Sequence, residues 1–191
     1  MGPPVVDAPE PELTRLRAET LAPLARTLDE SRRLRAAEAR VADELAGLPD
    51  GLWLVERDVL VGVRRIPFLV LGATGVFAIC PTDGAWTLED LRVMSELGGD
   101  VHAQLPGYDG PVHGLVCLAF DDMKPRAWFG GEPQRGRGGW VLGVAWLQAW
   151  MFGFGHEHGL RNGDVRHLHE VAGPVWSRRS SARLPVIARF G

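Results

Sequence analysis

The amino-acid sequence predicts an α/β fold in which helices flank a mixed β-sheet and a helical arm precedes the sheet. Two observations lead to this prediction. Leucines and valines recur at helical spacing over 13–48, and three short apolar runs then follow one another over 52–80. The chain has 191 residues, of which 46% are hydrophobic. This is enough to bury one sizeable core, and we find no internal repeat.

The N-terminal third predicts a short lead followed by helix. Residues 1–12 are acidic and proline-rich, which favours a disordered lead, and they lack the basic and apolar regions of a signal peptide. Residues 13–33 predict a helical arm that Pro23 should kink or split. A stronger helix should follow over 34–48 and end at the turn signal at 49–51. We expect the apolar stripe of the arm to dock on its own domain or to form a homo- or hetero-oligomer.

The middle of the chain predicts strands and one helix. Apolar runs at 52–61, 65–72 and 75–80 are typical of short β-strands, and the sequence GATG between the last two predicts a hairpin turn. Apolar residues spaced three apart predict a helix over 87–105, and the run VHGLVCLAF predicts a strand over 112–120. This order of elements indicates a mixed sheet.

The last third predicts helices and a tail. A surface loop should follow Lys124, and the tryptophan-rich run at 140–154 predicts a buried core helix because most of its sides are apolar. That run is shorter than the ~20 residues of a membrane span and contains Gln148, so we expect no membrane contact and a cytoplasmic location. A shorter helix around 163–172 and a basic tail at 176–191 complete the prediction.

The two cysteines, Cys80 and Cys117, both lie in apolar, strand-like runs. This placement predicts buried free thiols in a reducing compartment and no disulfide. We expect the two residues to be neighbours in the sheet and chemically inert, because no nearby charge pattern should lower a thiol pKa.

The net charge of −3 gives no reason to expect the whole chain to bind nucleic acid, but the charges are unevenly distributed. Residues 1–60 carry twelve acids and eight arginines, whereas residues 160–191 carry six arginines and two acids. The arginines that could contact phosphate or an acidic partner are Arg135, Arg137, Arg178, Arg179 and Arg183. A solvated surface is the alternative interpretation of the same residues.

The segment 36–86 reads AAEARVADELAGLPDGLWLVERDVLVGVRRIPFLVLGATGVFAICPTDGAW. Its distinctive features are the helix pattern Glu38-x-x-Val41-x-x-x-Leu45-x-x-Leu48, the paired strands around GATGVFAI, and Gly84-Ala85-Trp86 after the second strand. In these features the chain resembles the nuclease-related domain (NERD) of the PD-(D/E)xK nuclease superfamily. The resemblance covers roughly 34–172 and implies a NERD-like domain over 34–175 with a restriction-endonuclease-like mixed sheet.

The resemblance also implies where a metal site would lie. The family's helix glutamate matches Glu38, whereas its first-strand aspartate, second-strand acid and lysine fall on Pro67, Cys80 and Thr82. Proline offers no ligand atom, a lone thiol is a poor Mg²⁺ ligand, and threonine has no charge to stabilise the attacked phosphate. We therefore expect a catalytically inactive domain, without a metal cofactor, that binds nucleic acid or a protein partner.

The alternative interpretation is a working nuclease. Asp58 and Asp83 could join Glu38 in a rebuilt site that binds Mg²⁺ or Mn²⁺ and cleaves DNA. Metal-dependent cleavage of phosphodiesters requires two or three converging carboxylates, which these residues would supply.

Two further sequence patterns could suggest a metal site, but neither predicts one. Asp109 with Asp122 and Lys124 repeats the acid–acid–lysine spacing, but the interval crosses one strand of ~30 Å, so the aspartates should lie at opposite ends. The histidines occur in pairs spaced two residues apart, of which His158 and His169 could bind a transition metal across a turn. Solvated or helix-capping histidines are the preferred interpretation. The paired histidines are His156, His158, His167 and His169.

Overall fold

The structure, a computed structural model, describes residues 10–72, 74–128, 139–153, 167 and 170, with side chains of the first helix from residue 23 onward. Its elements in chain order are α1 (Glu10–Leu45), β1 (Trp53–Val61), β2 (Arg64–Gly72), β3 (Gly75–Thr82), α2 (Leu88–His102), β4 (Val112–Leu118), β5 (Arg126–Trp128), β6 (Gly139–Gly143), the 3₁₀ turn η1 (Val144–Trp146) and α3 (Leu147–Gly153). Among these, every helix is too short or too polar to cross a membrane.

The six strands form one mixed sheet in the order β1-β2-β3-β4-β6-β5. Strands β1, β2 and β3 are antiparallel neighbours, whereas β3, β4 and β6 run parallel and β5 adds an antiparallel edge. Helix α2 forms the crossover from β3 to β4, as a parallel connection requires. The predicted α/β class with a mixed sheet is confirmed.

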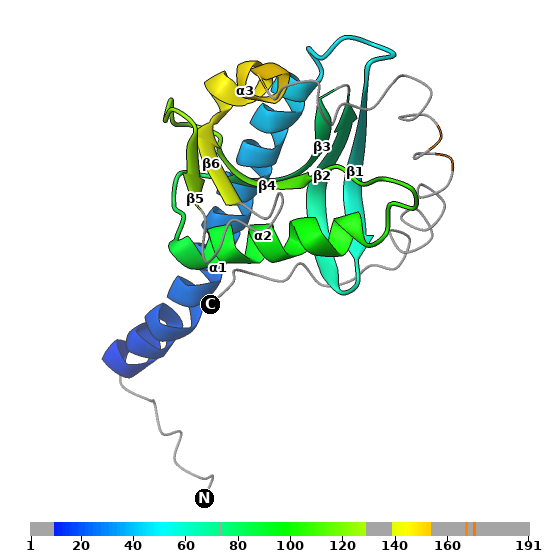
Figure 1. Ribbon diagram of the computed structural model, residues 1–191. Helices are drawn as coiled ribbons and strands as arrows, with labels where there is room; N and C mark the ends of the chain where they lie inside the picture. The colour runs from blue at the N-terminus through cyan, green and yellow to red at the C-terminus, as the bar shows by residue number, and fades with distance from the viewer. Residues whose placement is uncertain (1–9, 73, 129–138, 154–166, 168–169, 171–191) are drawn as a thin grey trace, which may run out of the picture.

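Helices lie on both faces of the sheet (Figure 1), and each face buries a separate core. The α2-side core joins α2 to the sheet; its members include Ile66, Leu71, Val76, Leu91, Met94, Leu97 and Val116. The α1-side core joins the C-terminal half of α1 and α3 to the other face; its members include Val41, Leu45, Phe68, Phe77, Ile79, Leu142 and Met151. The central strands are therefore apolar on both faces, which is typical of strands covered by helices on both sides.

Helix α1 packs on the sheet only through its C-terminal half. Ala37, Val41 and Leu45 follow at intervals of four and are fully or almost fully buried. Pro23 was predicted to kink or split this segment, and the split does not occur, because α1 continues through it for 36 residues. An interior proline removes one backbone hydrogen bond and crowds the preceding turn, but it does not end this helix. The Thr27 hydroxyl donates a hydrogen bond to the Pro23 carbonyl at 3.0 Å.

The hairpin predicted at GATG is confirmed by the pairing of Gly72 with Gly75 across the β2–β3 turn. The β1–β2 hairpin contains an irregularity instead of a continuous ladder. Arg57 pairs with Phe68 and Val59 with Ile66, so Asp58 lies opposite Pro67 without a ladder pair. Proline cannot donate a ladder hydrogen bond, and Asp58 has φ of 57°, a left-handed conformation that aspartate tolerates better than most residues.

The predicted core helix at 140–154 is wrong in its first half. Residues 139–143 form the buried parallel strand β6, and α3 begins only at residue 147. A short, continuously apolar run is compatible with either structure, so the sequence pattern alone does not separate them. Residues 126–128, expected to be loop, form β5. Most of the helix predicted at 163–172 lies outside the described residues.

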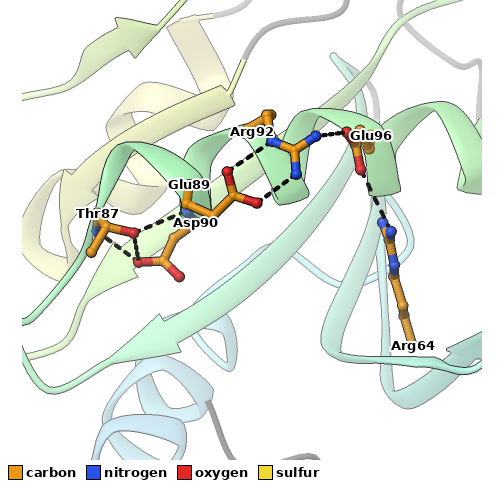
Figure 2. A network of polar contacts seen from close by, with 6 residues as sticks. All are labelled: Arg64, Thr87, Glu89, Asp90, Arg92 and Glu96. Atoms are coloured by element: carbon orange, nitrogen blue, oxygen red, sulfur yellow. Dashed lines mark hydrogen bonds and ion pairs between the residues drawn. The ribbon is translucent and has the colours of Figure 1, made fainter. Parts of the chain in front are cut away.

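Helix α2 begins with a capping box, in which Thr87 and Asp90 bond each other's backbone amides (Figure 2). On its outer face, Arg92 pairs with Glu89 at 2.5 Å and with Glu96 at 2.6 Å. Arg64 of β2 contacts Glu96 at 3.5 Å and thus connects the network to the β1–β2 hairpin (Figure 2). These exposed pairs add little stability, so the fold depends mainly on the two cores.

Helix α2 approaches the parallel strands closely because glycines lie at the contact. A Cβ atom on Gly114 of β4 would come within 2.1 Å of the Met94 carbonyl oxygen, and one on Gly98 within 2.8 Å of the Val112 carbonyl oxygen. A Cβ atom on the neighbouring Gly99 would meet nothing within 4 Å. The two adjacent glycines of α2 therefore differ in the room they have for a side chain.

We predict that Gly98→Ala lowers the free energy of unfolding by on the order of 1–3 kcal/mol, because the new methyl group must displace the β4 backbone. Gly99→Ala should raise it by about 0.5–1 kcal/mol through helix propensity. Urea unfolding of both variants measures the difference. Equal effects of the two substitutions would contradict this packing of α2 on β4.

Candidate functional site

The candidate site lies at the outer end of the β1–β2 hairpin, where one arginine contacts two carboxylates. Arg65 Nη1 donates a hydrogen bond to Glu38 Oε1 at 2.7 Å, and Nη2 donates to Glu38 Oε2 at 3.3 Å. Arg65 Nε also donates to Asp58 Oδ1 at 2.6 Å. The guanidinium therefore lies between Glu38 and Asp58 and binds both through its forked geometry.

Three elements position this triad. Glu38 follows the buried Ala37 on α1, so the packing of the helix brings its carboxylate to the hairpin. Arg65 pairs with Leu60 across the β1–β2 turn, which places Asp58 at the diagonal position two residues away. Side chains of diagonal cross-strand neighbours are within reach of each other. The triad is thus a consequence of hairpin register and helix packing together.

The triad is partly open to water. The exposed fractions of the side chains are 22% for Glu38, 36% for Arg65 and 53% for Asp58. Partial burial by itself would lower the pKa of Arg65, but the hydrogen bonds to Glu38 and Asp58 outweigh it and raise that pKa. The arginine is therefore firmly cationic, and the triad as a whole carries one excess negative charge.

Cys80 lies close to this triad on β3, and its thiol is a neutral group. The residue is partly buried against the α2-side core. Burial raises the pKa of the thiol to about 11, and the negative charges of Asp90 and Glu38 act in the same direction. A thiol that stays protonated at neutral pH is a poor nucleophile.

Pro67 and Thr82 complete the positions expected from the family resemblance. Pro67 is buried, and the β2–β3 register of Phe68 with Ile79, continued by one residue, places Pro67 opposite Cys80. The Thr82 hydroxyl donates a hydrogen bond to the Ala85 carbonyl at 2.6 Å, so it stabilises the turn after β3. Residues 67 and 80 therefore face each other just beyond the last pair of the β2–β3 ladder.

The rebuilt metal site is not formed by its three carboxylates. Within the described residues, no three His, Cys, Asp or Glu side chains lie close enough to hold a metal ion, and Glu38, Asp58 and Asp83 are all described. Arg65 brings Glu38 and Asp58 together, but Asp83 does not join them. Asp109 and Asp122 lie before and after β4, as expected for residues at opposite ends of one strand.

Cys117 is a neighbour of Cys80 but faces the opposite core. In the β3–β4 ladder, Cys117 pairs with Pro81, the residue after Cys80. Cys117 is fully buried in the α1-side core. Successive strand residues point to opposite faces, so the two thiols are not aligned for a disulfide. Both cysteines are free, and burial raises the pKa of Cys117 to about 12.

A second surface feature lies at the carboxyl ends of β4 and β6. A shallow hollow of about 600 Å³ is lined by Arg40, Ala119, Phe120, Asp121, Asp122, Val144 and Ala145. Beside it, the Trp146 indole donates a hydrogen bond to the Asp122 carbonyl at 2.9 Å, and Lys124 lies 6.0 Å from the indole ring centre. The charges around the hollow are mixed, so it favours neither an anionic nor a cationic ligand.

Several predicted contact residues lie outside the described part of the chain. These are Arg135, Arg137, Arg178, Arg179, Arg183, His156, His158 and His169. Their roles stay predictions.

Arg65 is the site residue that the sequence analysis missed. The signal was present, because the two-residue turn at 62–63 sets the hairpin register that makes Asp58 and Arg65 diagonal neighbours. The contact with Glu38 depends on the placement of α1 against the sheet, which no local pattern specifies.

Comparison with known proteins identifies no relative: no family model, no curated protein and no solved structure matches this chain.

We predict that Arg65→Gln lowers the free energy of unfolding by about 1 kcal/mol, because it leaves two carboxylates facing each other while water screens the partly exposed site. A double-mutant cycle with Glu38→Gln should show that the two side chains are coupled. The exposed Glu89–Arg92 pair of α2 is the matched control and should show a weaker coupling. Additive effects of the Arg65 and Glu38 substitutions would contradict the triad.

We predict that iodoacetamide labels neither thiol of the folded protein at neutral pH. The pKa of Cys80 is raised from 9.0 to about 11, so its protonated form is favoured in the folded state. This preference for the protonated Cys80 thiol stabilises the folded state fully below pH 9 and is lost as the pH rises through 11. Labelling of Cys80 should therefore increase only in alkali. Mass spectrometry with and without denaturant measures this, and Cys80→Ala identifies the signal of Cys117. Rapid labelling of native Cys80 at pH 7 would contradict the assignment.

Proposed function

We propose that this chain is a catalytically inactive, nuclease-related (NERD-like) domain of the PD-(D/E)xK type. In this proposal it acts in the cytoplasm as a binding or assembly module for nucleic acid or a protein partner. The observation that most strongly supports an inactive domain is the position of Arg65. Its guanidinium donates hydrogen bonds to both Glu38 and Asp58.

The chemistry of phosphodiester hydrolysis explains why this observation matters. A divalent ion must be held by carboxylates whose oxygens are free, and a cation must face the attacked phosphate. Here the carboxylates of Glu38 and Asp58 are already hydrogen-bonded to a permanent cation. The neutral Cys80 thiol and the Thr82 hydroxyl, which bonds its own turn, supply neither a hard ligand nor a charge.

A second candidate is a divalent-metal-dependent DNA nuclease, and one observation favours it. Glu38 and Asp58 come from distant parts of the chain and meet at one point, as metal ligands do. For Mg²⁺ or Mn²⁺ to bind there, Arg65 would have to move away and Asp83 would have to approach. This candidate therefore requires a rearrangement that the first does not.

Binding is the function that remains when catalysis is lost. The arginines of the loop at 135–137 and of the tail at 178–183 are the candidate contacts for a phosphate backbone or an acidic protein. Because phosphate contacts release counterions, nucleic-acid binding through these arginines should weaken steeply with salt, whereas a mainly apolar protein interface should not.

We predict that the purified chain cleaves neither plasmid nor oligonucleotide DNA in the presence of Mg²⁺ or Mn²⁺. Agarose and denaturing gel assays over a range of metal concentrations test this. Cleavage that persists through purification and is abolished by Glu38→Gln would overturn the proposal in favour of the metal-dependent nuclease. Glu96→Gln, a carboxylate of α2 that lies outside the triad, is the matched control for nonspecific loss of activity.

The binding half of the proposal needs its own measurement. Fluorescence anisotropy with labelled single- and double-stranded DNA, repeated at rising salt, should show either salt-dependent binding or none. If none is detected at low salt, a DNA partner is excluded and the protein partner becomes the preferred one.

A further inference from the structure

The N-terminal part of α1 extends beyond the domain (Figure 1). Every described side chain from residue 23 to residue 33 is exposed, whereas burial on the sheet begins at Ala37. We call residues 10–33 the arm. A helix of this length spans ~36 Å. In its described half, residues 23–33, the rest of the described chain does not cover the side chains.

The described half of the arm exposes large apolar side chains. Leu24 and Leu28 are 58% and 59% exposed. They lie four residues apart, so they share one face of the helix. The leucines of the whole arm are Leu13, Leu16, Leu21, Leu24 and Leu28.

The arm is a poor candidate for an isolated helix. A helix in water without tertiary packing is marginal even for favourable sequences. The arm also contains Pro23, which costs about 3 kcal/mol in a helix interior. A helical arm therefore requires a packing partner that covers its leucine face.

The charges of the arm favour a second copy of itself. Residues 10–33 contain five arginines and five acids, so the arm has no excess of positive charge to attract a polyanion or an acidic membrane. Residues 10–21 carry three acids and two arginines, and residues 22–33 carry three arginines and two acids. Antiparallel pairing places each half against the half of opposite net charge, and it also opposes the helix dipoles.

The leucine positions are compatible with the same arrangement. Leu13 lies eight residues before Leu21 and Leu28 lies seven residues after it. Two copies crossing near Leu21 therefore bring the outer leucines of both ends into register, as a two-fold interface requires.

We propose that the arm pairs with the arm of a second copy of this chain, so that two antiparallel helices bury their leucine faces and form a homodimer. In the assembly role proposed above, the partner is then a second copy of this chain. The role of the dimer in assembly rests on that proposed function. The pairing itself holds whether or not the domain cleaves DNA.

We predict that the full chain sediments as a dimer and that Leu24→Gln/Leu28→Gln makes it a monomer at the same concentration. Both leucines lie outside the two cores, so circular dichroism should show that the domain remains folded. Arg26→Gln/Glu30→Gln is the matched control: it leaves the net charge unchanged, lies mainly on the opposite side of the helix, and should remain dimeric. A monomeric wild type, or a dimer that survives the leucine substitutions, would overturn the proposal.

Cross-linking distinguishes the antiparallel arrangement from a parallel one. A cysteine at the centre, Thr20→Cys, should form a disulfide with its counterpart under mild oxidation. A cysteine near the end of the same leucine face, Ser31→Cys, should not, because antiparallel pairing separates the two copies of residue 31 by about 30 Å. Efficient cross-linking at both positions would indicate parallel helices and refute this arrangement. The native thiols should not interfere, since burial keeps both protonated.

Discussion

The central strands β2 and β3 are apolar on both faces, and the positions of the helices follow from this constraint. One face must be covered by the C-terminal half of α1 and by α3, and the other by α2. Because α2 is also the crossover to β4, its close packing on the parallel strands both covers the sheet and sets its order. The candidate site lies where this covering stops, at the end of the β1–β2 hairpin, which is why its groups reach water.

How far the sequence predicts this molecule depends on whether the signal is local. The first three strands, the hairpin at GATG and α2 were predicted because turn residues and apolar spacing act over a few residues. Strand β6 was mistaken for a helix because a buried parallel strand is apolar at every position, and only its neighbours in the sheet make it a strand. Helix α1 was expected to kink or split at Pro23, but it is continuous over 36 residues, because the local cost of one proline does not by itself end a helix that packing holds at its C-terminal half.

The candidate site shows the same division. The position of Pro67 opposite Cys80 follows from the register of one hairpin, and the sequence predicts the turn of that hairpin. The cation between Glu38 and Asp58 comes from residue 65, and its contact with α1 requires a helix to be placed against a sheet. A contact made through tertiary packing leaves no spacing pattern in the sequence. The family resemblance therefore led us to expect that the acids and the lysine are replaced, but it did not predict the arginine.

The left-handed conformation of Asp58 has a consequence for the edge of the sheet. Strand β1 is an outermost strand of nine residues, and a regular strand of that length would present its free backbone groups to another chain. At Asp58 the backbone turns out of the strand path and carries a charge at the same point. At the edge of the described sheet, a left-handed residue with a charge interrupts the regular backbone that an incoming strand would need, so long edge-to-edge pairing along β1 is disfavoured.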